Sequence, residues 1–121
     1  MKPLSTLIIA VLFFLPAISQ KLPSGTYIFK YCDFEYNSCL GGTCKVVIKG
    51  DSITVLATKD LATQITGTAA GDTLAKGIIL KHKSGKWIIG QSSNDSQAEL
   101  VITDEKVIPE LNFRKKQFWT F

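Results

Sequence analysis

The sequence predicts a small all-β domain, either an antiparallel barrel or a sandwich, of about six to eight short strands built from β-hairpins. Three observations lead to this prediction. Short runs rich in β-branched and aromatic residues recur along the chain, and turn signals containing glycine or asparagine separate them. No long stretch has the apolar period of an amphipathic helix. Short strands at this spacing are typical of small barrels and sandwiches.

The N-terminal segment, residues 1–19, has the three regions of a secretory signal peptide. Lys2 is followed by an apolar run over residues 7–15, and small residues precede the expected cleavage between Ser19 and Gln20. The apolar run is much shorter than the roughly 20 residues that a membrane-spanning helix needs. No cysteine lies near the cleavage point to accept a lipid. We therefore expect a secreted or periplasmic protein with no transmembrane segment after signal removal.

The remaining chain is expected to form one domain, residues 20–121. Removing 19 of the 121 residues leaves 102, which suits a single hydrophobic core. The loss of Lys2 lowers the formal net charge from +4 to +3. This excess is too small to indicate a nucleic-acid partner, although a weak preference for anionic surfaces or polymers is compatible with it.

The first half of the domain contains the clearest hairpin. Residues 26–36 have strand composition, and residues 37–42 supply a loop. Gly50-Asp51 then predicts a two-residue turn that places Lys49 opposite Ser52. Alternation along both strands assigns six residues to the buried face: Cys44, Val46, Ile48, Ile53, Val55 and Ala57.

The segment 59–72 has a less definite pattern. It is compatible with one helical turn capped by Asp60 or with a short edge strand, and its many small residues favour a loop.

A second hairpin is expected from residues 74–83 and 86–91 around Ser84-Gly85. This register places His82 opposite Trp87 and Lys83 opposite Lys86. One face would then hold Leu80, His82, Trp87 and Ile89. Gly77 and Gly90 are interpreted as marks of a bulge or barrel corner. Residues 92–97 form a polar connection, residues 99–103 and 111–114 are further short strands, and residues 116–121 close the chain.

Three cysteines, Cys32, Cys39 and Cys44, lie in one short segment. In an oxidising compartment they predict one disulfide and one remaining thiol. We favour Cys39–Cys44 with Cys32 buried, and Cys32–Cys44 across a hairpin is the alternative. A zinc site formed with His82 is disfavoured because the spacing matches no standard zinc motif. We expect no metal and no cofactor.

The sequence offers little for catalysis. Asp33 and Glu35 are two residues apart on an expected strand, which would place them about 6 to 7 Å apart on one face. This separation is near the range of paired carboxylates in glycoside hydrolases. Catalytic carboxylates usually converge from different elements, so a solvated strand end is the simpler interpretation. His82 is the only histidine and no G-x-S-x-G motif is present. We expect no enzyme, and a small hydrolase using Asp33 and Glu35 is the least favoured reading.

Two basic clusters are the candidate binding residues: Lys81, Lys83 and Lys86 at the second hairpin tip, and Arg114, Lys115 and Lys116 near the C-terminus. If the last strand pairs nearby, the clusters would merge into an anion-binding surface. The alternative is that these lysines protect an exposed strand edge.

The expected function is a non-enzymatic binding module for an anionic or extracytoplasmic ligand. The alternative is an inhibitor of an extracellular hydrolase that inserts a disulfide-stapled loop, residues 37–43. In size, expected export and cysteine use, the chain is similar to the lysozyme-inhibitor barrels. It lacks their characteristic loop, so the similarity implies a class of exported barrel and no functional residue.

Overall fold

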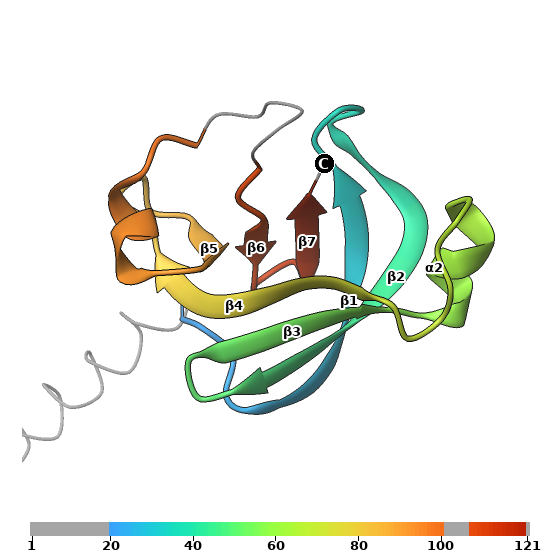
Figure 1. The fold of residues 1–121 in the computed structure, drawn as a ribbon, viewed down its shortest axis with the longest axis horizontal. Helices are drawn as coiled ribbons and strands as arrows, with labels where there is room; N and C mark the ends of the chain where they lie inside the picture. Colours follow the sequence, from blue (N-terminus) through green and yellow to red (C-terminus); the bar gives the residue numbers. More distant parts are fainter. Residues whose placement is uncertain (1–19, 101–106, 121) are drawn as a thin grey trace, which may run out of the picture.

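A computed structural model describes residues 20–100 and 107–120, which form a closed seven-stranded barrel (Figure 1). The barrel confirms the all-β prediction and distinguishes barrel from sandwich. The strands are β1 (Gly25–Asp33), β2 (Ser38–Lys49), β3 (Ser52–Ala57), β4 (Thr73–Lys81), β5 (Trp87–Gly90), β6 (Glu110–Asn112) and β7 (Gln117–Thr120). The expected signal peptide, with Ser19, and most of the expected strand at 99–103 lie outside the described residues.

The barrel closes through its first and last strands. Each strand pairs antiparallel with the next along the chain, from β1 to β7. Because the number of strands is odd, β1 and β7 run in the same direction. They pair in parallel from Lys30 opposite Gln117 to Asp33 opposite Thr120. This pairing brings the C-terminal residues beside the N-terminal half of the domain.

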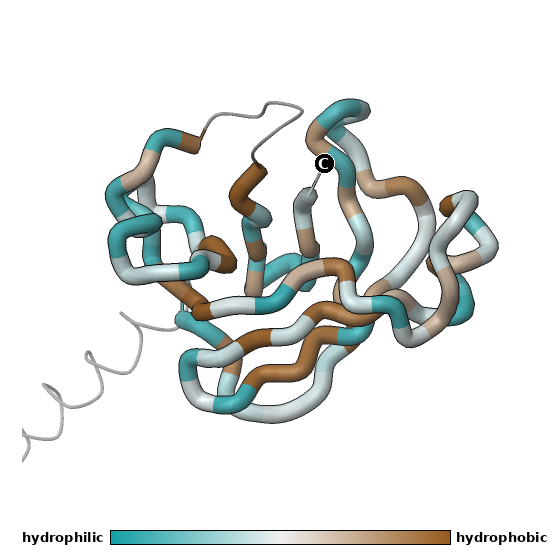
Figure 2. The backbone as a smooth tube through the Cα atoms, in the orientation of Figure 1, coloured by the Kyte–Doolittle hydropathy of each residue, from teal (hydrophilic) through white to brown (hydrophobic). Residues whose placement is uncertain are grey.

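The β2–β3 hairpin supplies much of the core, as the sequence predicts. Lys49 pairs with Ser52 and Ile48 with Ile53, which is the register that the Gly50-Asp51 turn requires. All six residues assigned to its inner face are buried. Phe29 and Phe118 join them from the closing strands, both fully buried. Figure 2 shows hydrophobic residues along this hairpin and mainly polar ones in the connection after β5.

A short helix, α2 (Lys59–Gln64), follows β3 and packs on β2. The favoured loop is therefore wrong for residues 59–64, which form the helical alternative, and right for residues 65–72; the helix cap is Thr58, not Asp60. The Thr58 hydroxyl accepts the Leu61 N–H at 3.1 Å. Leu61 is fully buried and lies directly against Gly42, where an added Cβ would be 2.6 Å from Leu61 Cδ1. Glycine at that position lets the helix approach the strand.

The β4–β5 hairpin has a different register from the predicted one. Lys81 pairs with Trp87 and Leu80 with Ile88, so the loop spans residues 82–86. The expected pairing of His82 with Trp87, and the face built on it, are wrong. A register shift of one residue exchanges the two faces of β4, so Ile79 and Lys81 share the face of Trp87 instead. His82 lies beyond the end of the strand and is buried in the loop.

Two expected connections between strands contain regular structure, and one expected strand is shifted along the chain. The expected loop at 37–42 is mostly strand, since β2 begins at Ser38 and the turn occupies residues 34–37. The polar connection 92–97 contains the 3-10 helix η1 (Ser93–Gln97). The short strand expected at 111–114 is found as β6 at Glu110–Asn112.

Candidate functional site

The β4–β5 and β6–β7 hairpins meet around a cavity of about 320 Å³. Its walls come from the end of β4, the loop into β5, the short strand β6 with its following turn, and β7. This volume lies near the lower limit for small-molecule sites in proteins. The lining residues are Gln20, Lys81, Gly85, Lys86, Trp87, Glu110, Leu111, Asn112, Phe113, Arg114 and Trp119.

Three of the six predicted basic residues reach this cavity: Lys81, Lys86 and Arg114. The two sequence clusters thus meet, because β5 pairs with β6 and β6 with β7. The other three, Lys83, Lys115 and Lys116, are not among the lining residues. The cavity therefore takes two residues from the first predicted cluster and one from the second.

Local backbone bonds account for the position of the excluded residues. The Lys83 N–H donates to the Ser96 carbonyl at 2.9 Å, which turns this part of the loop toward η1. The Lys115 N–H donates to the Asn112 side chain at 2.9 Å. Lys116 adopts a φ of 53°, and its carbonyl accepts the Lys30 N–H at 2.8 Å. These bonds hold the β6–β7 turn against β1 and leave Arg114 at the cavity.

Both tryptophans of the chain line the cavity, together with Phe113. The Trp87 and Phe113 rings meet edge to face, with centroids 5.6 Å apart. Lys81 Nζ lies 4.8 Å from the centroid of the Trp87 ring, within cation–π range. Sequence reasoning missed the role of Trp119, because its neighbours come from distant parts of the chain.

The charges around the cavity are mixed but predominantly positive. Lys86 Nζ lies 3.3 Å from a Glu110 carboxylate oxygen. The Glu110 side chain is only 14% exposed, so this ion pair is more shielded at the acid than at the lysine, which is 59% exposed. Three cationic side chains against one carboxylate leave an excess of two positive charges among the lining residues. The cavity therefore favours an anion.

His82 organises the loop that carries Lys86. Its Nδ1 accepts the Ser84 N–H at 3.1 Å and lies 2.8 Å from the Ser84 hydroxyl. The ring hydrogen is therefore on Nε2, which donates to the Ala98 carbonyl at 2.6 Å. The buried imidazole ties the loop to the segment after η1. The Ser84-His82 contact is a local turn bond, and neither residue lines the cavity.

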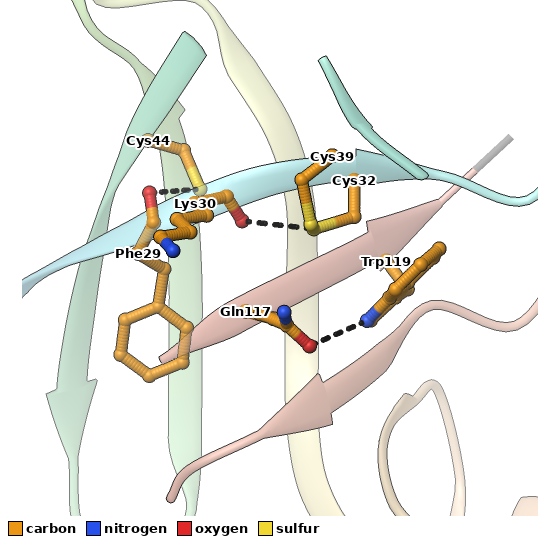
Figure 3. Close-up of a disulfide and its surroundings, with 7 residues drawn as sticks. All are labelled: Phe29, Lys30, Cys32, Cys39, Cys44, Gln117 and Trp119. Carbon is orange, nitrogen blue, oxygen red and sulfur yellow. Dashed lines mark hydrogen bonds between the residues drawn. A yellow bond between two sulfur atoms is a disulfide. The ribbon is translucent and has the colours of Figure 1, made fainter. Parts of the chain in front are cut away.

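The disulfide joins Cys32 and Cys39 across β1 and β2 and leaves Cys44 as a buried thiol (Figure 3). The favoured Cys39–Cys44 pair is wrong because both residues lie on one extended strand, where five residues span about 16 Å. Phe29, not Cys32, lies opposite Cys44, so the alternative Cys32–Cys44 pair does not form either. Burial raises the pKa of the Cys44 thiol to about 12.

The disulfide also closes a turn that presents an exposed tyrosine. Cys32 and Cys39 face each other at the base of residues 33–38, and Tyr36 near the tip is 65% exposed. Phe34 stacks on Trp119 at a centroid distance of 5.7 Å. The Phe34 N–H donates to the Thr120 carbonyl at 2.9 Å. These contacts fix the turn against β7.

The structure does not place Asp33 and Glu35 as a strand-face pair. Asp33 ends β1, and its carboxylate accepts the Glu35 N–H at 2.7 Å, while Glu35 belongs to the turn. The alternation on which their predicted spacing depends stops at Asp33. Over residues 20–100 and 107–120, no group of three or more histidine, cysteine, aspartate or glutamate side chains is arranged to hold a metal ion.

Comparison with protein-family models, with curated proteins and with solved structures finds no match to this chain. In the described part of the chain, no helix has both the length and the apolar character needed to span a membrane. The functional argument therefore starts from the cavity between the two hairpins.

Proposed function

We propose that this chain is an exported, non-enzymatic binding module that holds a small anionic ligand in the cavity between the β4–β5 and β6–β7 hairpins. One observation carries the proposal: Lys81 and Lys86 from one hairpin line the same cavity as Arg114, which is distant from them in sequence. Export is part of the proposal and rests on the N-terminal sequence.

The walls of the cavity support binding of an anion. Trp87, Phe113 and Leu111 supply apolar surface beside the cations. Charges interact more strongly near such a surface than in open water, because the local dielectric constant is lower. Arg114 offers a planar set of donors that fits a carboxylate or another oxyanion in two-point contact.

The test compares two triple variants of equal net charge. In the cavity variant, Lys81, Lys86 and Arg114 are each replaced by glutamine. We expect it to lose retention on a carboxymethyl matrix at moderate salt, because the converging charges are removed. Circular dichroism and a thermal melt establish that the barrel remains folded.

The matched control replaces Lys83, Lys115 and Lys116 by glutamine and has the same net charge. We expect the control to retain most of its binding, since these residues do not line the cavity. Equal losses in the two variants would contradict the proposal, because retention would then depend on net charge alone.

A second candidate function is inhibition of an extracellular hydrolase by the disulfide-closed turn, residues 33–38. Exposure of Tyr36 on a turn that is already held by Cys32–Cys39 favours it, because a rigid aromatic side chain loses little entropy on binding. This turn replaces the 37–43 loop of the sequence-based alternative, since β2 occupies most of that loop.

The two functions respond differently to single substitutions. In inhibition assays against a panel of extracellular glycosidases and proteases, Tyr36→Ala should abolish any inhibition, whereas Arg114→Gln should not. Reduction alone is a poor discriminator, because Cys32 pairs with Trp119 of the cavity wall in the sheet. Inhibition that persists in Tyr36→Ala would eliminate the turn as the inhibitory element.

A further inference from the structure

The aromatic side chains of the cavity are held in fixed orientations before any ligand binds. Phe34 stacks on Trp119 but does not line the cavity, so it supports the ring from outside. Trp87 contacts Phe113 edge to face and has Lys81 Nζ near its ring. Rigid aromatic walls reduce the entropy lost on binding and favour a ligand with a flat apolar surface.

The polar lining includes more than cations. Glu110 supplies a carboxylate, and Asn112 and Gln20 supply side-chain amides. These groups bind hydroxyls, since a carboxylate accepts hydrogen bonds and an amide both donates and accepts them. A bare oxyanion such as sulfate can use only the donors of the two amides, and it is repelled by Glu110. The lining therefore fits a ligand with hydroxyl groups as well as negative charge.

The distribution of apolar surface argues against a membrane lipid. Within the described residues, Ile28 and Tyr36 are the large hydrophobic side chains that are exposed, and neither lines the cavity. A site for a headgroup embedded in a bilayer would need apolar side chains around its mouth to enter the membrane interface. The ligand should therefore be a water-soluble molecule or polymer.

We infer that the ligand is a sugar ring carrying a carboxylate, such as a hexuronate unit of an acidic polysaccharide. The inference rests on the proposed anion-binding function and specifies its ligand class. The C–H face of the ring packs on the indole walls, its hydroxyls bond to Glu110 and Asn112, and its carboxylate pairs with Arg114. A volume of about 320 Å³ suits one or two such units.

Calorimetric titration with digalacturonate tests the inference, with cellobiose and inorganic sulfate as comparison ligands. We expect digalacturonate to bind at least about 10-fold more tightly than either, because only it uses both the aromatic walls and the cations. It should also shift the tryptophan emission, since both indoles border the cavity.

Two variants separate the contributions of charge and stacking. Arg114→Gln should weaken digalacturonate binding about 10-fold and leave cellobiose binding unchanged, because Arg114 contacts only the carboxylate. Trp119→Leu should weaken binding of both sugars. Lys115→Gln is the control of equal charge change on the same turn, and it should bind as the unmodified protein does.

The outcomes distinguish the inference from the function on which it rests. Sulfate binding as tight as digalacturonate binding would overturn the sugar assignment and leave the anion site in place. Cellobiose binding as tight as digalacturonate binding, or digalacturonate binding that Arg114→Gln does not change, would overturn the carboxylate assignment. Failure of all three ligands to bind, together with equal retention of the two triple variants on the carboxymethyl matrix, would overturn the anion site itself.

Discussion

Alkaline pH should destabilise the fold through Cys44, and the substitution Cys44→Ala should remove this effect. The Cys44 side chain is fully buried in the barrel core, where its thiol lies 3.6 Å from the Phe29 carbonyl oxygen. Burial disfavours the thiolate and raises the pKa of Cys44 to about 12. In the unfolded chain the same thiol ionises near its ordinary pKa of about 8.5.

The sign and magnitude follow from proton linkage. Between the two pKa values the unfolded chain has lost a proton that the folded chain retains, so stability falls as pH rises. The contribution is complete below about pH 8.5 and falls by about 1.4 kcal/mol per pH unit above it. Raising the pH from 7 to 10 should therefore cost the unmodified protein about 2 kcal/mol through this thiol.

The assay is urea unfolding followed by tryptophan emission at pH 7, 8.5 and 10, for the unmodified protein and Cys44→Ala. The alanine variant loses a roughly constant amount for its smaller side chain, so the gap between the two proteins should shrink by about 2 kcal/mol at pH 10. Burial also raises the pKa of Tyr31, with smaller effects from Asp33 and Cys44. The effects of burial and Asp33 act in both proteins, whereas that of Cys44 is lost in the alanine variant together with the thiol.

Thiol–disulfide exchange is the main competing process at high pH. Acid quenching and peptide mass mapping establish that Cys32–Cys39 remains intact in every sample. A gap that stays constant from pH 7 to pH 10 would refute the reasoning, because it would mean that Cys44 ionises equally in both states.

Two further predictions concern packing and the loop that borders the cavity. Leu61→Ala should lower the free energy of unfolding by about 2 to 5 kcal/mol, because it empties the fully buried contact of α2 with Gly42. A loss below about 1 kcal/mol in urea denaturation would show that α2 is not anchored there. His82→Ala should lower the free energy of unfolding by about 1 to 3 kcal/mol, because the Ala98 carbonyl loses its imidazole donor. Hydrogen exchange of the Lys83 amide should accelerate, and unchanged exchange would contradict the role of His82 in holding the loop.

The two main hairpins show where sequence reasoning succeeds and where it fails. Gly50 adopts a φ of 60°, which suits a two-residue turn, and the alternating apolar residues beside it specify the same register. Ser84-Gly85 gives a similar turn signal. There the register is shifted by one residue: the His82 N–H still donates to the Lys86 carbonyl, while the buried imidazole bonds to Ser84 and Ala98. A distant carbonyl cannot be inferred from local pattern.

The candidate site was predictable to a similar extent. Lys81, Lys86 and Arg114 stand out in the sequence as parts of basic clusters. Trp119 and Glu110 lie in the site because β6 pairs with β5 and β7 pairs with β6. This long-range pairing cannot be inferred from the local sequence. The disulfide was mispredicted for a related reason: glycines at 41 and 42 suggested a loop where the chain continues as strand.

The parallel pairing of β1 with β7 has a consequence for how the chain acquires its structure. Lys30 and Gln117 are neighbours in the sheet although most of the domain separates them in sequence. Contacts between such distant residues slow folding, so the closing seam should form late. Until residues 117–120 dock, one edge of β1 stays unpaired and open to other chains. A truncated or incompletely synthesised chain should therefore aggregate through β1.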